Sequence, residues 1–259
     1  MTRELTDLEA LDALAWQIEL GADEAMSEEP INRLETLPEP QKTTEVETKA
    51  EATVKPQEVG PSDQGAAQIA ANCANLDQLR EALSAFEGCS LKKGARNTVF
   101  GDGNPEARVM IIGETPGREE DQAGKPFVGR SGHLLDKMLA AIDLTRNAQT
   151  PQKAVYLTNA MPWRPPQNRD PSIEEILMMK AFLVRHIELA APKFIITMGN
   201  TATKTVLDVT TGITRMRGTW GDINSIPVLP MFHPEALLRD PSKKKEAWAD
   251  LLSLKARLL

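Results

Sequence analysis

Residues 108–130 read RVMIIGETPGREEDQAGKPFVGR, a short apolar run followed by a long loop rich in charge, glycine and proline. The run Val109–Ile112 is wholly apolar, which is the pattern of a central strand buried on both faces. Gly113 ends the run, and Phe127 is an aromatic residue with little core to enter in a loop of this composition. Open α/β sheets keep their chemistry in loops at the carboxyl ends of strands, so we expect the functional site here.

Beyond this loop, apolar runs alternate with segments of helical period. Strands are predicted at 109–112, 154–158, 193–198 and 226–231, and helices at 76–86, 131–143, 172–190, from 201, and at 242–259. A hairpin-like segment is predicted at 215–220. Strands separated by helices favour a parallel sheet that is covered on both faces. We therefore predict an α/β fold, a three-layer α/β/α sandwich with a central four-stranded parallel sheet.

Formal charge is unevenly distributed along the 259 residues. Residues 1–75 carry 16 acids and 5 bases, whereas residues 76–259 carry 21 acids and 25 bases. The net charge of −7 therefore belongs to the front of the chain, and the mildly basic remainder permits a nucleic-acid partner. The two cysteines, Cys73 and Cys89, suggest neither a disulfide framework nor a metal site.

The apolar runs are too short to span a bilayer, and the first residues lack the basic-then-apolar pattern of a leader. We therefore expect a cytoplasmic protein with no membrane partner. We also expect it to be a monomer.

The amino-terminal part of the chain divides into two segments. Leu5–Leu20 has the apolar stripe of an amphipathic helix, and Gly21 is a stop signal. Residues 26–70 are acidic, lack a period and are rich in proline, threonine and glutamate, which indicates a disordered linker. We predict a helix within residues 1–25 and a single folded domain at 71–259. The helix either packs on the domain or binds a protein partner from a flexible tether.

Polar side chains follow three of the predicted strands. Glu114 and Thr115 come after the first strand. Asn159 follows the second strand, and His233 follows the last. Because the carboxyl ends of parallel strands lie at one edge of a sheet, we expect these side chains to converge on one crevice. The other two histidines fall inside predicted helices, where packing or solvation is their usual role.

Three blocks of the sequence resemble family four uracil-DNA glycosylases. They are residues 113–130, 155–169 and 217–241, which read GETPGREEDQAGKPFVGR, VYLTNAMPWRPPQNR and RGTWGDINSIPVLPMFHPEALLRDP. The blocks occur in order, and the resemblance covers residues 86–259. It implies a uracil-DNA glycosylase-like fold. It also implies an enzyme that flips uracil out of single- or double-stranded DNA and hydrolyses its N-glycosidic bond, leaving an abasic site for base excision repair.

The resemblance also implies roles for residues of a base pocket. Phe127 would stack on the uracil ring, and Asn159 would pair with the N3 and O4 edge of the base. His233 would donate a hydrogen bond to O2, where negative charge develops as the bond to the sugar breaks. Gly113 and Glu120, from the same loop, would line the pocket. The alternative for Phe127 is that its ring only anchors the loop.

Other residues are candidates for contacts with the DNA strands. Leu237, Leu238 and Arg239 would form the wedge that fills the gap left by the flipped base. The candidate phosphate contacts are Lys243, Arg164 and Arg169. Solvated surface positions are the commoner fate of such basic residues.

The sequence departs from the family at the positions of its four-iron, four-sulfur cluster. Typical members hold that cluster with four cysteines. The corresponding residues here are Phe86, Cys89, Trp163 and Met179. One thiolate cannot hold a cluster that needs four, so we predict that this cofactor is absent and that apolar packing takes its structural place.

A second departure is Thr115, where members of the family usually have alanine. A hydroxyl group at this position could orient the attacking water. The sequence leaves the water-activating group open, with Glu114 and Glu120 as the available carboxylates. We predict His233, Asn159, Glu114 and Thr115 as the catalytic residues.

Two other classes of function stay open. One is a non-catalytic protein of the same fold that binds uracil-containing or abasic DNA, which the presence of Asn159 and His233 argues against. The other is a nucleotide hydrolase on a similar sheet. That class needs a phosphate loop or a metal-carboxylate spacing, and the sequence has neither.

Overall fold

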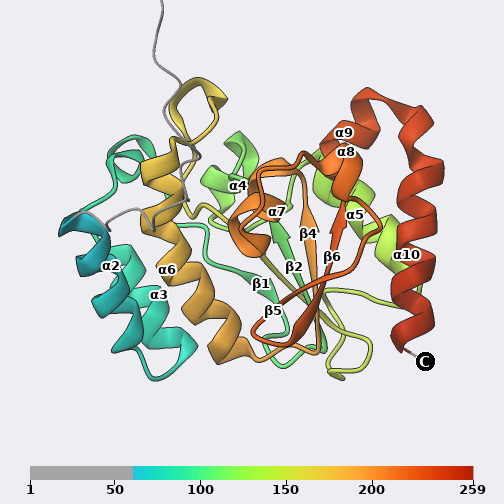
Figure 1. The fold of residues 1–259 in the computed structure, drawn as a ribbon, viewed down its shortest axis with the longest axis horizontal. Coiled ribbons are helices and arrows are strands. Elements are labelled where there is room, and N and C mark those ends of the chain that lie inside the picture. The colour runs from blue at the N-terminus through green and yellow to red at the C-terminus, as the bar shows by residue number, and fades with distance from the viewer. Residues whose placement is uncertain (1–60, 259) are drawn as a thin grey trace, which may run out of the picture. The chain divides into compact units, whose positions relative to one another are not determined.

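The structure of the protein, a computed structural model, describes residues 61–258 (Figure 1). The helix predicted within residues 1–25 and most of the linker predicted at 26–70 lie outside the described residues. The structure therefore does not test the predictions made for these two segments.

The linker prediction is wrong at its carboxyl end. Helix α2 spans Pro61–Ala71, inside the range predicted to be a linker. Ala66 and Ala70 lie four residues apart on this helix, and both are buried. Small side chains at this spacing let α2 pack closely against helix α6 (Ile173–Ala190). The segment has one large apolar residue, Ile69, and that side chain is 38% exposed, so the sequence shows no clear helical period.

The strands of the described region form one six-stranded sheet in the order β1-β3-β2-β4-β6-β5. The four central strands are parallel: β2 (Val109–Gly113), β3 (Val155–Asn159), β4 (Phe194–Met198) and β6 (Ile226–Met231). They confirm the predicted parallel sheet. Two antiparallel edge strands were not predicted, β1 (Asp102–Gly103) and β5 (Gly221–Ile223). Strands of two or three residues are too short to show an alternating pattern.

The hairpin lies further along the chain than the predicted segment 215–220. Ile213–Met216 form the short helix α8, and the hairpin joins β5 to β6. Its turn residues, Asn224 and Ser225, have φ angles of 49° and 65°. Such left-handed values are typical of two-residue hairpin turns, which match the twist of the strands that they join.

Helices cover both faces of the sheet, as the three-layer prediction requires (Figure 1). The helices α5 (Arg130–Ala140) and α10 (Lys244–Leu258) pack on one face, and α6 and α7 (Asn200–Leu207) pack on the other. Successive side chains of β2 point to alternate faces of the sheet. Val109 and Ile111 join the core cluster on the α5 side, whereas Met110 and Ile112 join the cluster on the α6 side. Each such buried side chain stabilises the fold by about 1.5–3 kcal/mol.

The other helices lie beside this sandwich or at its rim. Helix α3 (Leu76–Ala85) packs with α2 and α6. The remaining helical segments are α4 (Arg118–Ala123), α9 (Pro234–Arg239) and the 3-10 turns Ser90–Gly94, Pro166–Asn168 and Pro241–Lys243. No helix of the described residues is long and apolar enough to cross a membrane.

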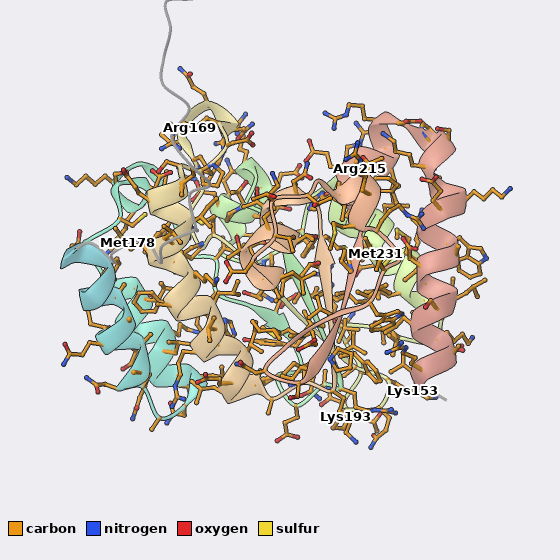
Figure 2. The ribbon with its side chains drawn as sticks, viewed as in Figure 1. Lys153, Arg169, Met178, Lys193, Arg215 and Met231 are labelled. Carbon is orange, nitrogen blue, oxygen red and sulfur yellow. The ribbon has the colours of Figure 1, made fainter. Side chains whose placement is uncertain are left out.

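The carboxyl ends of the parallel strands meet at one edge, where α4, α8 and α9 lie (Figure 1). Gly113 at the end of β2 is in register with Asn159 at the end of β3. In Figure 2, Arg169 and Arg215 lie at this edge, whereas Lys153 and Lys193 lie at the opposite end of the sheet. The loops that carry the predicted site therefore share one side of the domain.

Candidate active site

The ends of β2 and β3 bring Gly113, Asn159 and Phe127 together. A Cβ atom added to Gly113 would lie 2.6 Å from Cζ of Phe127 and closer still to Oδ1 of Asn159. No real Cβ contact is that short, so only glycine fits between the two side chains. The Asn159 carboxamide and the edge of the Phe127 ring thus meet above the end of the central strand.

Phe127 is more buried than the sequence suggested. Its side chain is 4% exposed and belongs to the core cluster on the α5 side of the sheet. Its ring also lies 5.6 Å from the imidazole of His233, between centroids, with 22° between the planes. The expectation that this ring has little core to enter is therefore wrong, and both a stacking role and an anchoring role fit its position.

His233 is held by its own backbone turn. It is the N-cap of α9, and its Nδ1 accepts a hydrogen bond of 3.2 Å from the N–H of Glu235. Since Nδ1 is an acceptor, the neutral imidazole carries its hydrogen on Nε2. Burial lowers the pKa of His233 to about 4, although the charge of Glu120 opposes the shift. At neutral pH the side chain is an uncharged donor.

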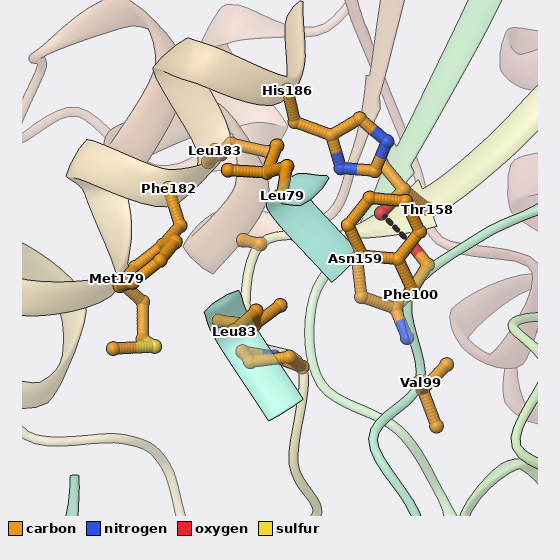
Figure 3. Close-up of a pocket in the computed structure, with 12 residues that line it drawn as sticks. Leu79, Leu83, Val99, Phe100, Thr158, Asn159, Met179, Phe182, Leu183 and His186 are labelled. Carbon is orange, nitrogen blue, oxygen red and sulfur yellow. Dashed lines mark hydrogen bonds between the residues drawn. The ribbon is translucent and has the colours of Figure 1, made fainter. Parts of the chain in front are cut away.

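Asn159 lies at the end of β3 and is 8% exposed. The described residues provide no hydrogen-bond partner for its carboxamide, so both polar ends are free to meet a ligand. The next residue back, Thr158, is occupied instead, because its hydroxyl donates to the carbonyl of Phe100 at 2.7 Å (Figure 3). A cavity behind Asn159 has a volume of about 20 Å³. That volume holds about one water molecule, so it is not a base pocket.

Glu120 organises the loop between β2 and α5. One carboxylate oxygen accepts from the N–H groups of Val128 and Gly129, both at 3.0 Å, and the other accepts from Gly117 at 3.1 Å. Three backbone donors engage both oxygens. This arrangement favours a loop-holding role for Glu120 over the predicted contact with the base or with water.

Glu114 reaches across to the start of α7. Its carboxylate accepts a hydrogen bond of 2.8 Å from the N–H of Thr201. Gly199 has a φ of 96°, and a Cβ atom there would collide with the Glu114 carboxylate. Burial raises the pKa of Glu114, while the N–H bonds from the helix oppose the shift. Thr115 follows at the loop surface and is partly exposed.

Comparison with known proteins identifies the family of this chain. The sequence profile of the Uracil DNA glycosylase superfamily matches residues 100–252. The chain belongs to this superfamily.

Several curated relatives are type-4 uracil-DNA glycosylases. The one from Archaeoglobus fulgidus is 36% identical to this chain, over 68% of this chain and 89% of the relative. The one from Saccharolobus solfataricus is 37% identical, over 71% of this chain and 87% of the relative. The one from Thermotoga maritima is 36% identical, over 65% of this chain and 86% of the relative.

The two leucines predicted as a wedge differ in position. Leu237 is 1% exposed and packs with Phe232 and Ala247, so its position does not favour the predicted contact with DNA. Leu238 is 36% exposed, and Arg239 is exposed beside it. Neighbouring residues of a helix point to different sides, so α9 presents one leucine to the core and the next to solvent.

The predicted phosphate contacts already have partners. Lys243 lies 3.2 Å from the Asp240 carboxylate. Arg169 forms two hydrogen bonds to Glu175, and Arg164 donates to the Asn168 side chain at 2.8 Å. The Arg169–Glu175 pair lowers the pKa of the Glu175 carboxyl to about 2. Any phosphate contact of Arg169 would compete with this pair.

In typical family four uracil-DNA glycosylases, four cysteines hold an iron–sulfur cluster. The residues at these four positions here pack together in the apolar core. Phe86, Cys89, Trp163 and Met179 are all buried, and the Phe86 ring packs edge-on against Phe182 at 5.3 Å. Only one of the four positions has a thiol, so these residues do not fit a cluster that needs four thiolates. Within the described residues, no group of three or more His, Cys, Asp or Glu side chains is arranged to hold a metal ion.

Sequence reasoning missed Arg146, which contacts the active-site loop. Its guanidinium donates to the carbonyl of Phe127 at 2.9 Å and to the Asp136 carboxylate at 2.8 Å. Arg146 lies in the irregular segment between α5 and β3. The partners are 19 and 10 positions away in the sequence, so no local pattern could have revealed them.

Proposed function

We propose that this protein is a uracil-DNA glycosylase of base excision repair. It flips uracil out of DNA and hydrolyses the N-glycosidic bond, which leaves an abasic site. The observation that carries the proposal is the meeting of Phe127, Asn159 and His233 at the carboxyl edge of the sheet, in a chain of this superfamily. A non-catalytic DNA-binding protein is not favoured, because relatives that align over most of their length are named glycosylases.

Asn159 would select uracil through its carboxamide. Its Oδ1 would accept from N3–H of uracil, and its amino group would donate to O4. Cytosine presents an acceptor at N3 and an amino group at C4, so both contacts would be mismatched. Each mismatched buried polar group costs roughly 1–3 kcal/mol, which is enough for strong discrimination.

Phe127 would support the flipped base from one face. Gly113 leaves open the space that the ring and the carboxamide share. A base held by stacking and by its N3–O4 edge is fixed in orientation, so its O2 atom points to one place in the site.

His233 would act at O2 as a neutral donor. Cleavage of the glycosidic bond leaves negative charge on the departing uracil, largely at O2. A hydrogen bond from Nε2 is therefore stronger in the transition state than in the ground state, which accelerates the reaction. The N-cap bond at Nδ1 and the pKa of about 4 both favour this tautomer and charge state.

A water molecule must attack the sugar carbon as the base leaves. Thr115 and Glu114 are the groups that we assign to this water. Glu120 is less suited, because both of its carboxylate oxygens accept backbone hydrogen bonds. On the DNA side, Leu238 would fill the gap in the stack, with Arg239, Lys243 and Arg164 near the phosphates.

We also propose that the enzyme works without an iron–sulfur cluster. Apolar packing of Phe86, Trp163 and Met179 around Cys89 would hold together the region that the cluster organises in relatives. Protein prepared without oxygen should contain no stoichiometric iron or sulfide, and finding both would refute this proposal. A monomeric state, a cytoplasmic location and a protein partner for residues 1–25 are further proposals.

Excision from defined duplexes tests the proposed function. The full chain should release uracil opposite guanine or adenine and leave a strand that alkali cleaves, while cytosine stays intact. Asn159→Asp should lower uracil excision and admit some cytosine, because a fixed acceptor then faces O4. Asn147→Asp, an exposed position, is the matched control. Tight binding of uracil-containing DNA with no cleavage would instead establish the binding-protein alternative.

A further inference from the structure

We propose that Arg146 is a positioning residue that holds the Phe127 ring in place for the base. The inference rests on the proposed function, in which Phe127 stacks on uracil. It adds a residue outside the blocks that resemble the family, and it acts through the backbone of the active-site loop.

The side chain of Arg146 is 10% exposed, and the three nitrogens of its guanidinium all form hydrogen bonds. Nη2 donates to the carbonyl of Phe127 at 2.9 Å, and Nη1 donates to the carbonyl of Pro126 at 3.3 Å. Nη1 also lies 3.2 Å from Asp102, and Nε donates to Asp136 at 2.8 Å. The two carboxylates orient the guanidinium, which is left facing two consecutive carbonyl groups of the loop.

The backbone at Phe127 needs such support because its φ is 52°. A bulky residue rarely adopts this left-handed conformation unless its surroundings impose it. Arg146 holds the carbonyl groups of residues 126 and 127, and Glu120 holds the N–H groups of residues 128 and 129. Arg146, which binds the backbone carbonyls, and Glu120, which binds the backbone N–H groups, therefore fix the loop on both sides of the Phe127 ring.

The opposite side of the Phe127 carbonyl is also closed. A Cβ atom on Gly132, in the first turn of α5, would collide with this carbonyl oxygen. The carbonyl thus lies between α5 and Arg146, and Asp102 connects the arrangement to the edge strand β1. Loss of the arginine would free the backbone to relax and would move the ring away from the base.

Lysine cannot replace this arginine, because one ammonium group cannot serve two carbonyls and two carboxylates in a plane. We expect Arg146→Lys to lower single-turnover uracil excision by about 10- to 100-fold, on single and double strands alike. DNA binding should change much less. Arg185→Lys is the matched control, because Arg185 also donates to a backbone carbonyl, that of Cys73, but lies on α6 away from the site.

A double-mutant cycle separates positioning from a general structural effect. In a Phe127→Ala background, Arg146→Lys should cost less than about two-fold, because the ring that it positions is gone. An equal loss in both backgrounds would overturn the inference while leaving the proposed function intact. Absence of any uracil excision by the unaltered protein would overturn both.

If Arg146→Lys does not fold, Asp136→Ala provides a second test of the positioning role. It removes one carboxylate that orients the guanidinium and leaves Arg146 itself in place. The inference requires a smaller loss of excision in the same direction, again absent in the Phe127→Ala background. Unchanged excision in Asp136→Ala, with Arg146→Lys unfolded, would count against a positioning role.

Discussion

At Gly113, a single methyl group decides whether two functional side chains can share their space. Gly113→Ala should displace Asn159 or Phe127 and lower uracil excision by at least about 10-fold, because small misplacements of reacting groups are costly. Single-turnover kinetics on a short duplex measures the effect. Gly65→Ala is the matched control, because a Cβ atom there meets nothing within 4 Å. Full activity in Gly113→Ala would refute the geometry of the pocket.

Two histidines with lowered pKa values should make the stability of the protein depend on pH. Burial lowers the pKa of His186 to about 3 and that of His233 to about 4. The unfolded chain binds these protons near pH 6.5, whereas the folded chain resists them, so the free energy of unfolding should fall as pH decreases from about 6.5 to 4. The slope should be up to about 1.4 kcal/mol per pH unit for each histidine.

Denaturant unfolding between pH 7 and 4 measures this slope. His186→Asn should make it shallower by about one proton, and it also removes the hydrogen bond of His186 to Tyr156. His133→Asn, at an exposed position of α5, is the matched control. An identical slope in His186→Asn and the unaltered protein would show that His186 is not the group responsible.

Two of the residues predicted for the site follow predicted strands. Asn159 and His233 could be found because a buried run ends just before each of them. Arg146 and the loop-holding role of Glu120 could not, since their partners are backbone groups brought close only by the fold. Leu237 and Leu238 looked equivalent in the sequence, because the short helix α9 is too brief to show which side faces the core.

At the scale of elements, truncating the two leucines of helix α9 to alanine should have two different effects, one on activity and one on stability. Leu238→Ala should lose activity on duplexes and keep it on single strands, where no stack has to be opened. Leu237→Ala should instead lower stability by about 2–5 kcal/mol, because it leaves a cavity in a buried cluster. Excision on both substrates, together with thermal melts, distinguishes them. The reverse pattern would show that Leu237 is the wedge.

Long buried elements were predictable, and short ones were not. The four parallel strands are short apolar runs, and the helices α5, α6 and α10 have a helical period, so all of them lie within a few residues of the predicted bounds. The edge strands β1 and β5 depend on pairing with a longer neighbour. Helix α2 depends on small alanines that fit against α6. Neither the pairing of the edge strands nor this alanine packing gives a clear pattern in the local sequence.

For the whole molecule, charge separates the acidic front of the chain from the domain. Residues 1–60 carry 15 acids and 5 bases, so this arm should repel DNA if it acts at all. Deleting residues 1–60 should leave excision on short duplexes unchanged or slightly faster, with the difference largest at low salt. Deleting residues 1–72 should in addition lower the melting temperature, because it removes α2. A large rate loss on removal of residues 1–60 would place the arm in the active site.

The central claim is that His233 stabilises the departing uracil. The direct measurement compares the single-turnover excision rate with the affinity for uracil-containing DNA in His233→Ala. We expect the rate to fall by about 10²–10³-fold while the affinity changes far less. His233→Ser, whose short hydroxyl can still cap α9 but cannot reach the base, should give the same result. Rate and affinity falling in equal proportion, or His233→Ser restoring the rate, would contradict this account.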